Sequence, residues 1–437
     1  MTATAIARLD MDIRSPESEP SRTDRVDLYA VGSADLARYA ALIVPAMADQ
    51  EHLARHRDAI RDYLDAGGVV VFGGHLHRDW LPGAAPFVPL SPPSLRGYRV
   101  AEIAEHPVFA GVEADDLTFR RGVAGFFARG QHPVPDGAEV LVRLGGGEPA
   151  TYVDRVSTGG TILVQASCDL LGYAGSAGGT ATRIPDQLLD WLRAESRVRP
   201  GATPRRTGTA APLTSLHRGG LAAVYGGSAP HHRAITTPKY ARHLTGGTVY
   251  LPELPDTDLT GLDGLVIPER MHHDLLEAGA RRVLDLLDAG GTVIAFSGGE
   301  PLPEFLPGVR WEHRPANYWW WLEPGAELGL RAPAPEHPLF THLGLRDCTW
   351  HYHGVLHPPE GAEVLVELPT GEALLYVDRV TTAGTLVVAT LDPISHYGSY
   401  FMPATERFLD GFLPWAARAV PARNCSASTV RTSAAEL

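Results

Sequence analysis

Two histidines in the last third of the chain have a spacing that suits metal binding or polar recognition. In His351-Tyr-His353 the imidazoles lie two residues apart. If the segment is extended, both imidazoles share one face, and Trp350 and Tyr352 take the other, because side chains alternate with period two. Zinc ligation, a polar binding cleft and plain surface or internally satisfied histidines all remain open. The first half has Phe126-Phe-Ala128 in the corresponding place, so the signal belongs to one half.

Polar side chains also follow two glycine turns. His75 and His77 follow Phe72-Gly-Gly, and Glu300 follows Phe296-Ser-Gly-Gly. These turns come after apolar strands, and open α/β sheets bind ligands at the carboxyl ends of their strands. The three side chains are therefore candidates to hold a sugar hydroxyl or a metal, against the alternative of loop residues that face solvent.

The densest aromatic run is Tyr318, Trp319, Trp320 and Trp321. Consecutive side chains cannot all point into one core, and aromatic faces fill interfaces and stack on sugars. A protein interface is our first interpretation; carbohydrate stacking and ordinary packing are the alternatives.

The element that must position these residues occurs twice. Tyr63-Leu-Asp-Ala-Gly-Gly precedes the apolar run Val69 to Phe72, and Leu286-Leu-Asp-Ala-Gly-Gly precedes Val293 to Phe296. Neither run alternates, which is typical of a parallel strand covered on both faces. Around this element we predict an edge strand in Thr2 to Asp12, and helices over Glu51 to Leu64 and Leu275 to Leu287.

The repeat extends over most of each half. Tyr152-Val-Asp-Arg-Val returns as Tyr376-Val-Asp-Arg-Val, 224 positions later, and such regularity indicates duplication. The recurring Asp-Arg pairs, Asp154 and Asp378 with their neighbours, suit a structural ion pair within paired strands. The predicted division is a first domain over 1–196, a linker over 197–218, a second domain over 219–421 and a disordered tail over 422–437.

The composition of the chain argues against several classes of binding partner. The chain has 437 residues and a formal charge of -13, which argues against a nucleic-acid binder and against binding to anionic membranes. Three cysteines without a CxxC pair disfavour a disulfide framework and a zinc-thiolate site. Neither a signal peptide nor a membrane-spanning run is recognisable, so we expect a cytoplasmic protein.

The order of these motifs resembles the class I glutamine amidotransferase-like superfamily. The strands that end in Pro45 and Pro268, the Asp-Ala-Gly-Gly turns, and the His-Pro units at His106 and His337 carry the resemblance. Within that superfamily the chain looks most like the trehalose-utilisation (ThuA-like) branch and the amidotransferase-like domain of some beta-galactosidases. The resemblance implies an α/β fold with two flavodoxin-like domains, mainly parallel sheets and added β-strands.

The ThuA-like resemblance also implies a role for His396, which matches a histidine of the closing loop. His351, His353 and His396 would then be catalytic residues and the ligands of a divalent metal such as zinc, with Glu300 as general acid or base. His75, His77, Tyr352 and the aromatic run would bind ligand.

The elbow turns depart from the superfamily because neither contains the nucleophilic cysteine, so glutaminase activity is not expected. Our leading interpretation is a pseudoenzyme, a catalytically degenerate tandem protein that serves as a binding or assembly module, with self-association or a protein partner. The first alternative is a ThuA-like enzyme that acts on a carbohydrate or other polar metabolite. The second is a structural subunit of a larger particle.

Overall fold

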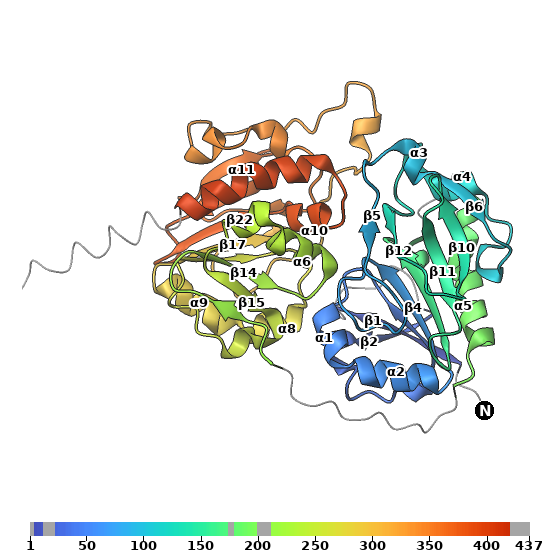
Figure 1. Ribbon diagram of the computed structural model, residues 1–437. Coiled ribbons are helices and arrows are strands. Elements are labelled where there is room, and N and C mark those ends of the chain that lie inside the picture. Colours follow the sequence, from blue (N-terminus) through green and yellow to red (C-terminus); the bar gives the residue numbers. More distant parts are fainter. Residues whose placement is uncertain (1–3, 12–21, 174–178, 199–210, 420–437) are drawn as a thin grey trace, which may run out of the picture. The chain divides into compact units, whose positions relative to one another are not determined.

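The chain folds as two compact mixed α/β units. The computed structural model describes residues 4–11, 22–173, 179–198 and 211–419 (Figure 1). One unit comprises residues 1–210 with 227–229, and the other comprises 211–226 with 230–437. The main boundary, between 210 and 211, falls inside the predicted linker, whereas 227–229 belong to the predicted second domain but group with the first unit. Residues 199–210 of that linker and the whole predicted tail lie outside the described residues.

The first unit is built on an eight-stranded sheet. Five neighbouring strands are parallel, and three antiparallel strands extend one side. Its order is β2 (Asp24–Asp27), β1 (Ala5–Asp10), β3 (Tyr39–Val44), β4 (Val69–Gly74), β12 (Thr161–Ala166), β11 (Pro149–Asp154), β10 (Glu139–Leu144) and β6 (Val100–Ile103). Two short pairs lie outside it: β5 (Val88–Pro89) with β9 (Gly130–Gln131), and β7 (Phe119–Arg120) with β8 (Val123–Ala124).

The second unit is built on a ten-stranded sheet. Parallel strands again form its centre, and antiparallel strands extend it. Its order is β13 (Ser215–Leu216), β15 (Gly247–Tyr250), β14 (Leu221–Tyr225), β16 (Gly264–Ile267), β17 (Thr292–Phe296), β22 (Thr385–Ala389), β21 (Ala373–Asp378), β19 (Val355–Leu356) and β18 (Trp311–Glu312), with β20 (Glu363–Glu367) paired to β21.

Helices cover both faces of each sheet. In the first unit, α5 packs with one hydrophobic core and α2 with the other; in the second unit, α11 and α9 do the same. The helices are α1 (Gln50–Arg55), α2 (Arg57–Asp65), α3 (Leu95–Tyr98), α4 (Ala114–Thr118), α5 (Ile184–Glu195), α6 (Ala229–Thr236), α7 (Pro238–Ala241), α8 (His273–Ala278), α9 (Ala280–Asp288), α10 (Pro393–Gly398) and α11 (Pro403–Ala419). None of the helices in the described part of the chain is long and apolar enough to cross a membrane.

The non-alternating runs are central strands, as the sequence predicts. Every residue of β4 and of β17 is buried, and each strand has a parallel neighbour on both sides. Burial on both faces removes the need for polar positions, which explains the continuous apolar pattern.

Several boundary predictions are wrong. The predicted edge strand, β1, lies between β2 and β3, because the short strand Asp24–Asp27 adds outside it. Each predicted single helix is two: one breaks at His56 and the other at Gly279. Ser215–Leu216, predicted as linker, pairs with β15 at the edge of the sheet.

The repeated Asp-Arg pairs match the prediction in part: the arginines form ion pairs with the neighbouring strand, Arg155 with Glu139 and Arg379 with Glu363, but the aspartates do not take part. The Asp154 carboxylate accepts hydrogen bonds from the backbone N–H groups of Val156 and Ser157. The Asp378 carboxylate accepts the equivalent bonds from Val380 and Thr381. The neighbouring arginines pair instead with glutamates, Arg155 with Glu195 and Arg379 with Glu363. The aspartates therefore stabilise the turn that follows the strand, a common local use of this side chain.

Candidate metal centre

The candidate centre lies at the carboxyl ends of three neighbouring parallel strands of the second unit. Glu269 and Arg270 follow β16, Glu300 follows β17, and Asp392 follows β22. Asp392 is also the residue that precedes the first turn of α10, which carries His396. Open α/β sheets place ligand sites at this edge, because the loops after parallel strands gather there.

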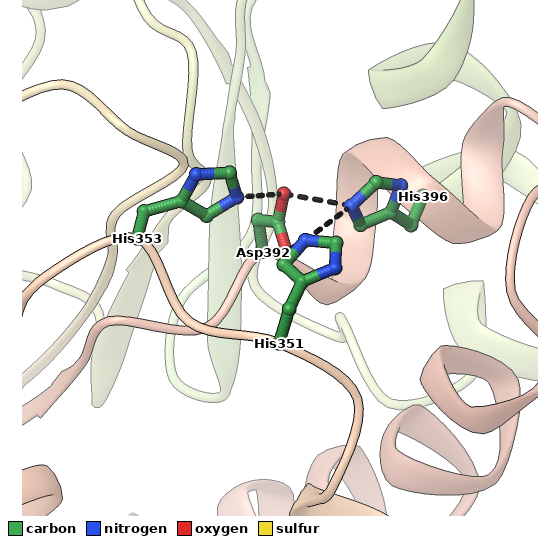
Figure 2. A group of neighbouring side chains, drawn as sticks. All are labelled: His351, His353, Asp392 and His396. Atoms are coloured by element: carbon green, nitrogen blue, oxygen red, sulfur yellow. Dashed lines mark hydrogen bonds and ion pairs between the residues drawn. The ribbon is translucent and has the colours of Figure 1, made fainter. Parts of the chain in front are cut away.

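Three imidazoles and one carboxylate converge at this edge (Figure 2). The Nε2 atoms of His353 and His396 each lie 2.9 Å from Oδ2 of Asp392. Nε2 of His351 lies 3.0 Å from Nε2 of His396 and 3.4 Å from Oδ1 of Asp392. One ligand atom from each of the four side chains lies within 4.8 Å of all the others.

The charge of the group is set by a buried carboxylate. Asp392 is 0% exposed, and His351 and His353 are also buried. Burial alone would raise the pKa of Asp392, but the charge of His396 and the hydrogen bonds of all three imidazoles hold that pKa well below its usual value. Burial lowers the pKa of His351, against the opposite effect of Asp392. The group therefore combines an ionised carboxylate with an imidazole that favours its neutral, metal-binding form.

The donor set fits a first-row transition metal. Imidazole suits zinc, copper, iron and nickel, and zinc sites combine histidine with carboxylate. With zinc–nitrogen bonds of about 2.0–2.1 Å, ligand atoms around a tetrahedral ion lie ~3.3 Å apart. Four of the separations among these side chains, 2.9 to 3.4 Å, are within a few tenths of an ångström of that value, and all the ligand atoms lie within 4.8 Å of one another. Small side-chain movements would admit an ion.

Outer contacts hold these side chains in place. The Tyr318 hydroxyl lies 3.0 Å from Nδ1 of His353, the ring nitrogen that does not face Asp392. Such contacts orient an imidazole and select its tautomer. Trp350 directs its Nε1–H toward Oδ1 of Asp392 at 3.4 Å, and a guanidinium nitrogen of Arg270 lies 3.6 Å from Oδ2.

A second buried acid lies beside the group. Glu269 is 0% exposed, and its Oε1 accepts the backbone N–H of Ser395 at 2.5 Å. Its own carbonyl lies 2.9 Å from Nε2 of His231. Burial, reinforced by the charge of Asp392, raises the pKa of Glu269 to about 8. This part of the unit thus concentrates acidic groups away from water, an arrangement that a bound cation would stabilise.

Of the site residues predicted from sequence, His351, His353 and His396 come together, and Tyr318 joins them from the aromatic run. The segment 351–353 is not a strand, so the predicted alternation does not apply, and Trp350 reaches Asp392 as the histidines do. Glu300 lies beside the group, where its Oε1 accepts the backbone N–H groups of Gly298 and Arg270.

The remaining aromatic candidates lie outside the four-residue group. Trp320 donates its Nε1–H to the carbonyl of Trp350, and Tyr352 accepts the N–H of Ala316 through its carbonyl. Trp319 is half-buried, and Trp321 is 49% exposed. The run therefore contributes one side chain, Tyr318, to the histidine group.

His75 and His77 belong to the first unit. His75 is buried, with Nε2 2.9 Å from Oγ of Ser167, and the backbone N–H of His77 donates to Gln50. No group of three or more histidine, cysteine, aspartate or glutamate ligands occurs among the first unit's described residues. When the two sheets are matched by their strand registers, Cys168 after β12 corresponds to Asp392 after β22. Burial raises the pKa of this thiol to about 12.

Sequence reasoning missed Asp392, although a signal was present. In Asp392-Pro-Ile-Ser-His396 the carboxylate and the imidazole are four residues apart at the start of a helix. Residues with this spacing are neighbours on a helix surface. Together with its place directly after an apolar strand, the spacing marks Asp392 as the partner of His396.

Comparison with known proteins leaves the family open. No protein-family model and no curated protein matches the chain. Solved structures with some likeness include the cytoplasmic protein STM1381 from Salmonella typhimurium LT2, with 15% identity, coverage of 40% of this chain and 82% of that one, and a TM-score of 0.28. The exo-beta-1,4-mannosidase Op5Man5 from Opitutaceae bacterium strain TAV5 has 13% identity, with coverage of 54% of this chain and 39% of that one, and a TM-score of 0.26. The GH42 beta-galactosidase Gan42B has 10% identity, coverage of 80% and 50%, and a TM-score of 0.23. At these scores the likenesses carry no functional argument.

Proposed function

We propose that the second unit binds one divalent transition-metal ion through His351, His353, Asp392 and His396, and that the bound ion serves a reaction of a small polar metabolite. The observation that carries the proposal is the convergence of three imidazole nitrogens on a fully buried carboxylate. Four ligand atoms within 4.8 Å of one another, at the edge where such sheets bind ligands, are the donor set and the location that a metal site needs.

Each residue of the centre would have a separate role in metal binding. The three imidazoles and Asp392 would hold the ion, and Tyr318 would orient His353 through Nδ1. A zinc-like ion polarises bound oxygen atoms and lowers the pKa of bound water. The substrate class, a carbohydrate or a related polar metabolite, follows from the ThuA-like resemblance and is part of the proposal.

The proposed ancestry is a duplicated amidotransferase-like unit that lost its thiol chemistry. Support comes from the shared order of strand directions in the two sheets and from the repeated sequence segments. The elbow turns contain no cysteine, and burial raises the pKa values of both Cys168 and Cys348. A thiol that stays protonated does not act as a nucleophile, so glutamine hydrolysis is not part of the proposed function.

A second candidate function, a binding or assembly module, is favoured by the aromatic run. Trp321 and Tyr318 are 49% and 42% exposed, which is unusual for large aromatic side chains. The double variant Tyr318→Ala/Trp321→Ala should then dissociate any oligomer of the wild-type chain in analytical ultracentrifugation. A wild-type chain that is monomeric at high concentration would remove self-association from this candidate.

Metal binding is tested by calorimetric titration of chelator-treated protein with zinc. The wild-type chain should bind one ion per chain, and His353→Ala and His396→Ala should weaken binding on the order of 100-fold or more, because each removes one ligand. The matched control is His357→Ala, which removes an exposed histidine paired with Glu312. Unchanged binding in the ligand variants would overturn the proposal.

A further inference from the structure

Arg270 lies beside the metal group and contacts its carboxylate. Its guanidinium lies 3.6 Å from Oδ2 of Asp392, and its side chain is 37% exposed whereas that of Asp392 is 0% exposed. Among the four ligand side chains, His396 is the most exposed, at 17%. Of the four ligand side chains, solvent therefore reaches His396 most.

The backbone of Arg270 is held in a conformation that arginine rarely adopts. Its φ is 61°, in the left-handed region, which residues with a side chain seldom occupy. Glu300 holds this conformation, since its Oε1 accepts the Arg270 backbone N–H at 2.6 Å. The same oxygen accepts the N–H of Gly298, which ties the loop after β16 to the loop after β17. Two loops thus cooperate to direct one guanidinium at the centre.

The charges favour an anion at this place. A divalent ion held by neutral imidazoles and Asp392 keeps a net positive charge, and the Arg270 guanidinium beside it balances the neighbouring Glu300 carboxylate. When Asp392 binds the ion, its negative charge is shared with the ion. The Arg270 guanidinium then has less negative charge beside it. The Glu300 oxygen that faces Arg270 is already bound to two backbone N–H groups. Carboxylate and phosphate groups match both the planar guanidinium and the ion.

We propose that Arg270 is a substrate-binding residue that selects an oxyanion, a carboxylate or a phosphate group, next to the metal ion. This inference rests on the proposed metal function and names the chemical class of its ligand: a small polar metabolite that carries an anionic oxygen group. Glu300 is then a positioning residue that acts through the Arg270 backbone, not a general acid or base.

The test uses the full-length zinc-loaded chain, with acetate and inorganic phosphate as separate probes in calorimetric titrations. Wild-type protein should bind at least one of them, and the stronger probe identifies the carboxylate or phosphate class. Arg270→Met should keep one zinc per chain and lose roughly 10- to 100-fold in anion affinity, the equivalent of one charge-assisted hydrogen bond or a bidentate pair. Arg270→Lys, which keeps the charge but not the planar fork, should lose less.

The control is Arg281→Met, an exposed arginine of α9 that pairs with Asp285, and it should bind the anion as the wild type does. Equal anion affinity in the wild type and Arg270→Met, with zinc bound to both, would overturn this inference and leave the metal function intact. A wild-type chain that binds no zinc would overturn both. Zinc stoichiometry also reports that each variant is folded, and Arg270→Lys serves if Arg270→Met does not fold.

Discussion

Asp392 is the residue on which the chemistry of the second unit depends. It is fully buried, and it faces three imidazoles and the Arg270 guanidinium. A buried carboxylate without partners would be costly, so its ionised state requires these neighbours. The same negative charge makes the place attractive to a cation, and this is why one side chain explains both the hydrogen-bond network and the proposed metal site.

Replacing this carboxylate should separate the two roles. We expect Asp392→Asn to weaken zinc binding on the order of 100-fold, and to lower the free energy of unfolding of the zinc-free chain by about 1–3 kcal/mol, because charged hydrogen bonds become neutral ones. Calorimetry and urea unfolding measure the two effects. Asp347→Asn is the matched control, since that carboxylate pairs with Arg407. Full zinc affinity in Asp392→Asn would show that Asp392 is no ligand.

A buried histidine of the first unit should make stability depend on pH. His132 is 1% exposed, its Nε2 accepts the backbone N–H of Leu76, and burial lowers its pKa to about 3. The folded pKa lies below the unfolded value of about 6.5, so this contribution is complete above pH 6.5 and is lost as pH falls toward 3. One proton corresponds to a slope of about 1.4 kcal/mol per pH unit.

The variant His132→Gln should lose that slope, because glutamine does not titrate. Urea unfolding between pH 7 and 5 measures it, and His313→Gln, at an exposed position, should behave as the wild type does. An unchanged slope in His132→Gln would contradict the assignment of this proton to His132.

At the residue scale, the sequence predicts the histidine pair, whereas Asp392 offers only the weaker signal of its spacing from His396. His351-Tyr-His353 is visible because two identical rare side chains stand close together in sequence. Asp392 and Glu269 are single acids in loops, and their proximity to the imidazoles depends on which strands are neighbours in the sheet. The spacing of Asp392 and His396 supplied a local clue, but only the strand order explains why the loop from β16 contributes Glu269 and Arg270.

At the element scale, the turn after β17 supports the site through a glycine. Gly299 has a φ of +110°, and a Cβ there would lie 3.2 Å from Nδ1 of His353. The glycine after β17 therefore leaves room for an imidazole. The turn packs against His353, a proposed metal ligand.

We therefore expect Gly299→Ala to lower both stability and zinc affinity. The positive φ should cost about 1 kcal/mol, and the added methyl group should displace His353 and weaken zinc binding about 10-fold. Gly371→Ala is a close control, because Gly371 has a φ of +95° and a Cβ there would meet nothing within 4 Å. It should lose stability alone. Equal zinc affinity in the two variants would contradict the role of the turn.

Element positions followed from sequence where burial is uniform. The apolar runs of β4 and β17 predict buried strands because nothing polar interrupts them. Helix boundaries were harder, since the apolar stripe continues across the breaks at His56 and Gly279. Periodicity reports which face is buried, and it does not report where a helix changes direction.

At the scale of the whole molecule, the two units share a strand order and differ in their side chains. In both sheets a block of parallel strands is extended by antiparallel strands beyond β12 or β22, and the second sheet also has the antiparallel strand β13 at its other edge. Cys168 follows β12 of the first unit at the position where Asp392 follows β22 of the second, and the sequence places Phe126-Phe-Ala128 opposite His351-Tyr-His353 only by the predicted repeat. The proposed chemistry therefore belongs to one unit, and the expected zinc stoichiometry is one per chain.

The repeat made the two-unit division predictable, because matched segments recur at a nearly constant distance along the chain. The pairing of Ser215–Leu216 with β15 was not predictable in the same way. Two residues carry no periodicity, and such a strand exists because an edge strand offers unpaired backbone groups nearby.

The proposed metal site is tested most directly by an anomalous difference map, measured at the zinc absorption edge from crystals of the zinc-loaded chain. We predict a single strong peak in the second unit, about 2.0–2.2 Å from Nε2 of His351, His353 and His396 and from a carboxylate oxygen of Asp392. A map in which zinc binds only at other residues, while these four side chains keep their hydrogen bonds to one another, would contradict it.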